Sequence, residues 1–194
     1  LCNNSEMLNF VAGYLTADKS AHGELTKKEC KGKIPLLLQW DRRWGYVSYG
    51  SSDIGLSGCA PTCLSMVIVG LTGNRNATPD KIAEYAQENG YYLKGTGTSW
   101  SLLTEGASYL GVEGREISLS KKTVQTALQQ GQPIICSVGP GDFTTTGHYI
   151  VLTTVASDGS IEVHDPNSQK NSDRTWNLEK LMAQTKNLWV YEKK

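Results

Sequence analysis

The apolar run at residues 63–71, CLSMVIVGL, constrains the fold of this chain more than any other feature. A helix built on this run is apolar nearly all round, so it has to be buried inside the protein. The run is far shorter than the roughly 20 residues that a membrane-spanning helix needs. Pro61 suits the first turn of a helix, and Gly73 can end it. We therefore predict a buried helix over residues 60–71 at the centre of a globular domain.

The remaining segments divide into a helical part and a strand-rich part. Three more helices are predicted before residue 132, and strands follow, with one short helix among them. This order favours an α+β domain over residues 34–194, with a helical half and an antiparallel β half. The helices are predicted within 78–90, 99–111, 120–131 and 177–185, and the strands at 133–138, 148–155, 161–165 and 188–192.

Two segments differ from this pattern. Residues 1–33 combine one short amphipathic helix over 5–15 with a polar stretch, and we expect them to form an N-terminal extension that packs on the main domain. Residues 41–58 are rich in glycine, serine and aromatic side chains, and they are predicted to form a long loop. Loops of this length in a compact domain are usually functional or disordered.

Charge and cysteine content narrow the class of protein. The formal net charge is zero, which gives no indication of nucleic acid or an anionic membrane as a partner. Five cysteines leave at least one thiol unpaired. Cys2 and Cys30 can pair with each other, whereas Cys136 lies in an apolar strand and is expected to be buried.

Cys59 and Cys63 differ in position although they lie one helical turn apart. Cys59 follows Gly58 at the start of the predicted helix, where unpaired backbone N–H groups and the helix dipole stabilise a thiolate. Cys63 lies inside the apolar run, where burial keeps a thiol neutral. Position therefore predicts a reactive, nucleophilic thiol at Cys59 and a buried side chain that packs in the core at Cys63. The alternative is that Cys59 is one more buried, inert cysteine.

A thiolate nucleophile needs a histidine as its base and a third group to orient that histidine. Of the three histidines, His148 lies on the apolar face of its predicted strand and shares this face with Asp165. An ideal two-residue turn at 158–159 places Leu152 opposite Asp165, which leaves His148 roughly 13 Å away along the ladder. A bulge, a longer turn or a curl after Gly147 has to close this gap. Asn167 is the alternative orienting residue.

The order Gln39, Cys59, His148 and Asp165 resembles that of papain-like cysteine peptidases. More narrowly, it is similar to the bacterial family related to the double-glycine leader peptidases of bacteriocin exporters. The resemblance spans about residue 34 to the end and rests on IPLLLQWDRRW, SGCAPTCLSMV, GDFTTTGHYIVL and VHDPNS.

The resemblance implies an active site in the cleft between the two halves of the fold. It implies Cys59 as nucleophile, His148 as general base and acid, and Asp165 as the orienting group. It also implies Gln39 as an oxyanion donor beside the Cys59 N–H, a role worth roughly 3–4 kcal/mol. One departure is Ala60, because the family usually has glycine after the nucleophile.

Further candidates for substrate contacts are aromatic or adjoin the predicted catalytic residues. Trp40, Trp44 and Trp100 can line a cleft, although packing is the commoner role of such side chains. Gly58 and Gly147, which directly precede Cys59 and His148, are also candidates for substrate contacts.

No metal or organic cofactor is predicted. The stretch at 165–176 looks like a calcium loop, but Lys170 and Trp176 occupy the positions where glycine and a bidentate glutamate are required. Cys59 and Cys63 have no second pair that would complete a zinc site.

The sequence therefore favours a peptidase, with a peptide, a protein or a cell-wall peptide as substrate. A peptidoglycan amidase or endopeptidase on the same fold is an alternative, and so is a peptide-binding module without turnover. We expect a monomer. The odd cysteine count, the start at Leu1 and the resemblance to bacterial surface peptidases favour an exported protein, outside the bacterial cell or on its surface.

Overall fold

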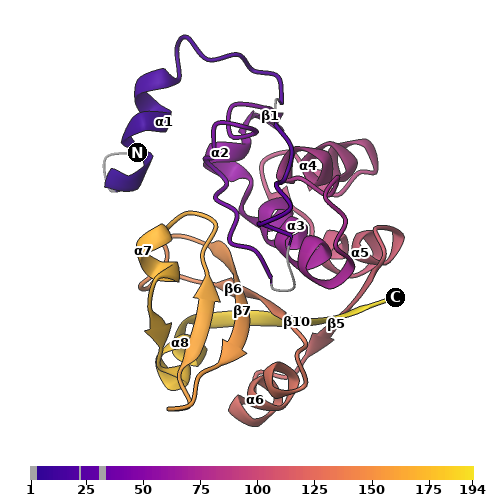
Figure 1. The fold of residues 1–194 in the computed structure, drawn as a ribbon, viewed down its shortest axis with the longest axis vertical. Coiled ribbons are helices and arrows are strands. Elements are labelled where there is room, and N and C mark those ends of the chain that lie inside the picture. Colours follow the sequence, from indigo (N-terminus) through magenta and orange to yellow (C-terminus); the bar gives the residue numbers. More distant parts are fainter. Residues whose placement is uncertain (1–3, 22, 31–33) are drawn as a thin grey trace.

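The structure is a computed structural model that describes residues 4–21, 23–30 and 34–194. Most helices gather in one half of the molecule, around α3 (Cys59–Thr72), and a six-stranded sheet flanked by the remaining helices forms the other half (Figure 1). The N-terminal helix α1 (Leu8–Gly13) lies at the edge of the helical half, beside α2 (Ile54–Ser57). The predicted α+β architecture is therefore confirmed. Cys2 and His22 lie outside the described residues, so the pairing of Cys2 with Cys30 stays a prediction.

The helical half is built around α3 (Cys59–Thr72), whose residues from Ala60 to Val69 are all buried. Gly73 ends this helix in a left-handed conformation with φ of 72°, as predicted. The same half contains η1 (Ser5–Met7), α1 (Leu8–Gly13), α2 (Ile54–Ser57), α4 (Pro79–Glu88), η2 (Trp100–Leu103) and α5 (Glu105–Tyr109). The helices beside the sheet are α6 (Lys121–Gln129), α7 (Gln169–Ser172) and α8 (Leu178–Gln184).

The sheet is antiparallel throughout, with the strand order β5-β10-β6-β7-β8-β9. One face packs on α3 and the other is covered by α6 and α8, so both faces carry buried side chains. Its strands are β5 (Val112–Ile117), β6 (Ile134–Val138), β7 (His148–Val155), β8 (Ile161–His164), β9 (Thr175–Trp176) and β10 (Thr185–Lys193), and the two small hairpins are β1 (Ser48–Tyr49) with β2 (Ser52–Asp53) and β3 (Tyr92–Leu93) with β4 (Gly97–Thr98).

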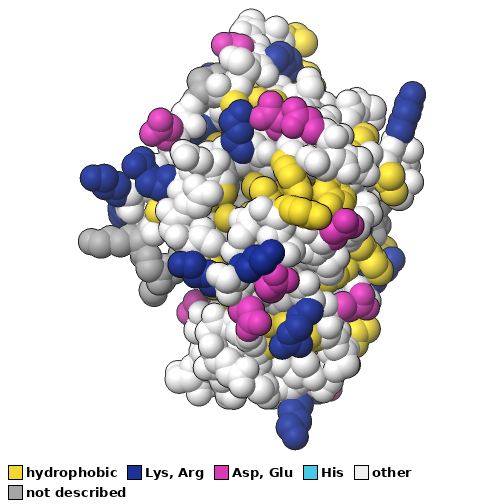
Figure 2. Space-filling model, turned by 90° about the vertical axis from the view of Figure 1, so that its right-hand side faces the viewer, with side chains coloured by type: hydrophobic (Ala, Val, Ile, Leu, Met, Phe, Trp, Pro, Cys, Tyr) yellow, Lys and Arg dark blue, Asp and Glu magenta, His cyan; other side chains and the backbone are white. Residues whose placement is uncertain are grey.

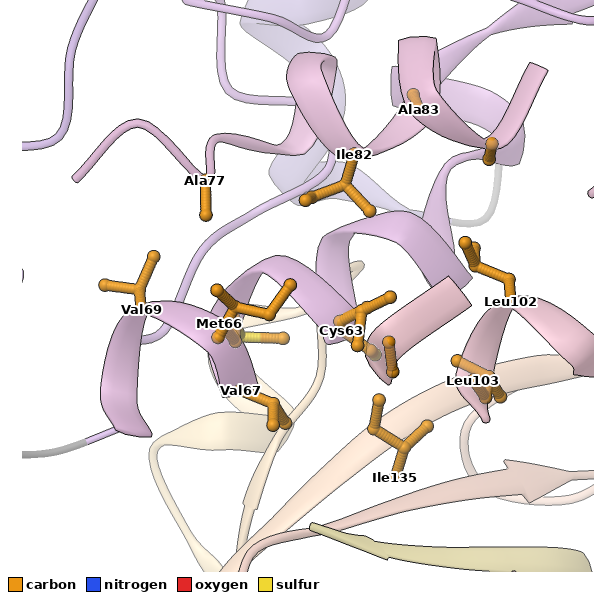
Figure 3. Close-up of a cluster of buried hydrophobic side chains, with 14 of the residues drawn as sticks. Cys63, Met66, Val67, Val69, Ala77, Ile82, Ala83, Leu102, Leu103 and Ile135 are labelled. Atoms are coloured by element: carbon orange, nitrogen blue, oxygen red, sulfur yellow. The ribbon is translucent and has the colours of Figure 1, made fainter. Parts of the chain in front are cut away.

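Cys63 belongs to the core between α3 and its neighbours. Figure 3 shows its side chain among those of Met66, Ile82 and Leu102, and it is fully buried. Burial raises the pKa of the Cys63 thiol well above its ordinary value. The assignment of Cys63 to packing is therefore confirmed. Cys136 is also buried, on the opposite face of the sheet, and burial raises its pKa to about 12.

Three sequence-based predictions need correction. The sheet strands do not all follow the helices, because β5 precedes α6 and pairs with β10. The single helix expected over 99–111 is divided at Thr104, because the Leu103 carbonyl accepts a hydrogen bond from the Tyr191 hydroxyl at 2.8 Å and does not continue a helix. The loop expected over 41–58 contains β1, β2 and α2, and it is ordered by buried aromatic side chains such as Trp44 and Tyr49.

The surface agrees with the balanced composition. On the face in Figure 2, basic and acidic side chains are intermixed, and a group of hydrophobic side chains is exposed near the middle. Among the described residues, no helix combines the length and the apolar character needed to cross a membrane.

Candidate active site

Cys59 is the first residue of α3, so its backbone N–H is one of those that a helix leaves unpaired at its start. Gly58 joins α2 to α3, and its N–H donates to the Ile54 carbonyl at 2.8 Å. A Cβ atom on Gly58 would lie 2.6 Å from that carbonyl oxygen, so only glycine fits this tight connection. The Cys59 side chain is partly exposed, whereas Ala60 is buried. The extra methyl group of Ala60 therefore points into the protein and leaves the approach to the thiol open.

His148 opens strand β7, and its ring contacts Asp165. The Nε2 atom of His148 lies 2.7 Å from Oδ1 of Asp165, and both side chains are buried. With Nε2 engaged in this way, Nδ1 is the ring nitrogen that remains for the Cys59 thiol. Asp165, and not Asn167, is therefore the group that contacts the histidine.

The register of β7 and β8 explains how His148 reaches Asp165. The turn is one residue longer than predicted, because it pairs Val155 with Ile161. A bulge between Leu152 and Thr154 then moves the register by one more residue, so that Leu152 faces Val163 and not Asp165. Asp165 thus comes level with Ile150, about 7 Å along the ladder from His148, a gap that the two side chains can close.

The Asp165 carboxylate is held on both of its oxygens. Oδ1 also accepts the backbone N–H of Asn167 at 2.8 Å, and Oδ2 accepts the side-chain amide of Asn171 at 2.8 Å. The backbone N–H of Asp165 donates to the Ser172 hydroxyl at 2.9 Å. The segment that looks like a calcium loop in the sequence therefore supplies the hydrogen bonds that fix this carboxylate.

The electrostatics of the site favour a charged histidine. Burial alone lowers the pKa of His148, but the hydrogen bond with Asp165 and the interactions with the negative charges of Asp165 and Cys59 outweigh it, so the pKa rises to about 10. An imidazolium beside a thiol favours the thiolate. The structure therefore brings His148 into contact with Asp165 and near enough to Cys59 for the charge of Cys59 to raise the pKa of His148.

Gln39 lies beside the connection that leads to Cys59. Its side-chain Nε2 donates to the Gly55 carbonyl at 3.0 Å, and its backbone N–H donates to the Pro166 carbonyl at 2.8 Å. A primary amide carries two N–H donors, so one donor remains on Nε2. The Oε1 atom is buried and has no hydrogen-bond partner within the described part of the chain. Gln39 thus ties the helical half to the segment after Asp165.

The predicted substrate-contact residues occupy different surroundings. The indole of Trp40 donates to the Asn167 carbonyl at 3.2 Å, while Trp44 is fully buried and belongs to the core. Trp100 is 48% exposed and packs edge-on against Trp189. Gly147 is exposed, with open space where a Cβ atom would lie.

Two tyrosines that were not predicted as site residues, Tyr49 and Tyr149, lie near Cys59. Burial is the main cause that raises the pKa of Tyr49 and of Tyr149 to about 12, and for each the charge of Cys59 adds to the effect. The Tyr49 hydroxyl lies 2.7 Å from that of Thr98, and Trp100 interacts with Tyr149. Tyr149 directly follows His148 on a strand, so strand alternation predicts that the Tyr149 side chain points to the opposite face of the sheet. No comparable sequence pattern predicts the position of Tyr49.

His164, the other described histidine, has a structural role. Its Nδ1 lies 3.2 Å from the Pro35 carbonyl oxygen, and burial lowers its pKa. It points to the opposite face of the sheet from Asp165, as the alternation of β8 predicts.

Comparison with known proteins was made at three levels. A search of curated protein sequences gave no match. Among solved structures, the chain is similar to the peptidase domain of Streptococcus ComA, a bifunctional ABC transporter involved in a quorum-sensing pathway. The TM-score is 0.52 at 19% identity, and the match covers 75% of this chain and 97% of the other. This likeness confirms the papain-like fold.

The family comparison extends over most of the sequence. The model of the Peptidase_C39 like family matches residues 31–194. This range includes Gln39, Cys59, His148 and Asp165, and it excludes the N-terminal 30 residues. The resemblance to papain-like leader peptidases is thereby confirmed, and the chain belongs to the Peptidase_C39 like family.

Proposed function

We propose that this protein is a cysteine peptidase that hydrolyses peptide bonds with Cys59, His148 and Asp165. The observation that carries the proposal is the 2.7 Å contact between His148 and Asp165, on a ring that also interacts with Cys59 at the start of α3. These groups come from the two halves of the fold and meet between them. Family membership supports the same reaction class.

The first step forms a thioester. The Cys59 thiol gives its proton to His148, and the thiolate attacks the carbonyl carbon of the scissile peptide bond. The remaining N–H of Gln39 and the backbone N–H of Cys59 donate to the oxyanion. When the intermediate collapses, the C–N bond breaks and His148 gives its proton to the leaving amine.

The second step releases the acyl group. A water molecule attacks the thioester carbonyl while His148 accepts one of its protons. The C–S bond then breaks, and the proton returns to the Cys59 sulfur. The products are a carboxylic acid and the free enzyme, so water is the only co-reactant. Asp165 keeps the ring oriented through both steps and stabilises its charged form.

Thiol labelling tests this proposal without knowledge of the substrate. Iodoacetamide should modify Cys59 near neutral pH much faster than it modifies a free model thiol, as located by mass spectrometry. Cys59→Ala should also remove all hydrolysis of peptide libraries. A Cys59 that reacts no faster than the model thiol, or hydrolysis that survives in Cys59→Ala, would show that the protein is not a cysteine peptidase.

The substrate also belongs to the proposal. We infer a peptide or protein substrate, cleaved by a monomeric protein that acts outside the bacterial cell or on its surface. Family membership supports a peptide substrate, and the resemblance to bacterial surface peptidases supports the location. Parallel incubations with purified cell wall and with peptide libraries test this choice. Release of cell-wall fragments alone would identify a cell-wall hydrolase.

A further inference from the structure

The N-terminal strap, defined here as Asn4–Tyr14, contacts both halves of the molecule. It consists of η1 and α1 and lies outside the residues matched by the family model. Figure 1 shows α1 beside α2, with η1 leading toward α7. The strap therefore runs between the element before Cys59 and the segment after Asp165.

On the β half, the strap holds the segment that carries Asp165. The Asn4 amide donates to the Asn167 carbonyl at 2.7 Å. The Glu6 carboxylate accepts the Ser168 hydroxyl at 2.6 Å and the Lys170 backbone N–H at 3.2 Å. The same segment supplies the Asn167 N–H and the Asn171 amide to the Asp165 carboxylate. The strap thus binds the same segment that holds the Asp165 carboxylate, and Asp165 in turn contacts His148.

On the helical half, the strap holds the turn that leads to Cys59. The Tyr14 hydroxyl donates to Oδ2 of Asp53 at 2.6 Å, while Oδ1 of Asp53 accepts the Leu56 N–H and caps α2. The Phe10 ring stacks on Tyr46 with centroids 4.4 Å apart. A Cβ atom on Gly55 would lie 2.4 Å from the tip of Phe10, so this ring packs directly on the backbone whose carbonyl binds Gln39.

Besides the strap, Gln39 and Trp40 hold the start of the Asp165 segment, through the Pro166 and Asn167 carbonyls. Over Gln169–Ser172, all of which the structure describes, no residue of α7 is buried. A polar pocket of about 420 Å³ adjoins this segment, and Asn4, Glu6, Asp165, Asn167 and Lys170 are among the residues that line it. Hydrogen bonds therefore hold the segment in place, and the strap provides four of them.

We propose that the N-terminal strap is a positioning element of the active site, which acts by fixing the Asp165 segment against the turn before Cys59. Glu6 is its main positioning residue, because one carboxylate holds both Ser168 and Lys170. This inference rests on the proposed function. The strap lies outside the residues that the family model matches, so the active site would depend on a part of the chain beyond that match.

The test compares Glu6 variants in the full chain by the rate of Cys59 alkylation with iodoacetamide. Glu6→Ala removes both acceptors and Glu6→Gln keeps one. Glu24→Ala is the matched control, since Glu24 carries the same charge in the N-terminal extension and its side chain is 88% exposed. Thermal unfolding of each variant shows that it is folded at the assay temperature.

If the strap positions Asp165, the effect of Glu6 on the alkylation rate of Cys59 should depend on pH. If Asp165 is less well placed, less imidazolium–thiolate pair forms, so Glu6→Ala should lower the alkylation rate about tenfold at about pH 7. The loss should shrink as the pH rises toward about 10, where an ordinary thiol is deprotonated without help. Glu6→Gln should recover part of the loss, and Glu24→Ala should match the wild type.

A double variant shows whether Glu6 acts through Asp165. In the Asp165→Ala background, Glu6→Ala should cause no further loss. Equal rates for folded Glu6→Ala and wild type at both pH values would overturn the proposal, as would an additive loss in the double variant. A wild type without fast Cys59 alkylation would instead reject the proposed function, so the two failures are distinguishable.

Discussion

The His148 ring and the Asp165 carboxylate form a buried pair, with 7% and 1% of their side chains exposed. The two residues lie 17 positions apart in the chain, and the longer turn and the bulge between β7 and β8 bring them into contact. Desolvation offsets much of the attraction in an intact buried ion pair, but removal of one partner leaves an uncompensated buried charge and is strongly destabilising. Stability and reactivity should therefore depend on pH through this pair.

The first prediction concerns stability. The pKa of His148 is raised to about 10 in the folded protein, above its ordinary value of 6.5. The stabilisation is therefore fully present below the unfolded pKa of about 6.5 and is lost as pH rises through about 10. At about pH 6, His148→Gln should lower the free energy of unfolding by about 3 kcal/mol, and the difference should shrink toward pH 10. Urea unfolding at several pH values measures it. A pH-independent difference would contradict this assignment.

The second prediction contrasts the two cysteines of α3. Cys63→Ala should keep fast alkylation at Cys59 and lower the free energy of unfolding by about 1 kcal/mol, because it leaves a small cavity in the core. Cys59→Ala should remove the fast alkylation and change stability little, because the side chain is partly exposed. Labelling with mass spectrometry and urea unfolding measure the two effects. Loss of fast labelling in a folded Cys63→Ala variant would contradict the division of roles.

The third prediction separates Gln39 from the acid–base groups. Gln39→Ala should lower kcat/KM for peptide hydrolysis about 100-fold, since one oxyanion donor is lost. Alkylation of Cys59 by iodoacetamide develops no oxyanion, so its rate should stay near that of the wild type. Comparison of the two rates in one preparation checks this. A parallel fall in both rates would show that Gln39 acts through the geometry of Cys59.

The fourth prediction concerns Asp165. Asp165→Ala should lower the alkylation rate of Cys59 at about pH 7 by at least tenfold, because the imidazolium loses its partner charge. The difference from the wild type should narrow as the pH rises toward about 10, because an ordinary thiol is then deprotonated without help. Asn171→Ala, which removes the hydrogen bond to Oδ2, should give a smaller loss in the same direction. Unchanged rates at neutral pH would contradict the orienting role of Asp165.

The sequence determined the features that depend on neighbours in the chain. An apolar run with Pro61 near its start fixes a buried helix, and Cys59 is thereby placed at its N-terminus. Strand alternation places His148 and Asp165 on the same face of the sheet, and that relation survives in the structure because the register changes by two residues in all. Both arguments use only the local periods of helix and strand.

Tertiary structure decided the rest. The contact of His148 with Asp165 depends on the length of one turn and on one bulge, which sequence periodicity does not encode. The proximity of Tyr49 to Cys59 and the hydrogen bonds of Glu6 to residues more than 160 positions away depend on how distant segments pack. Such contacts are set by the shape of the whole core, so they appear only once the two halves of the fold and the N-terminal strap are assembled.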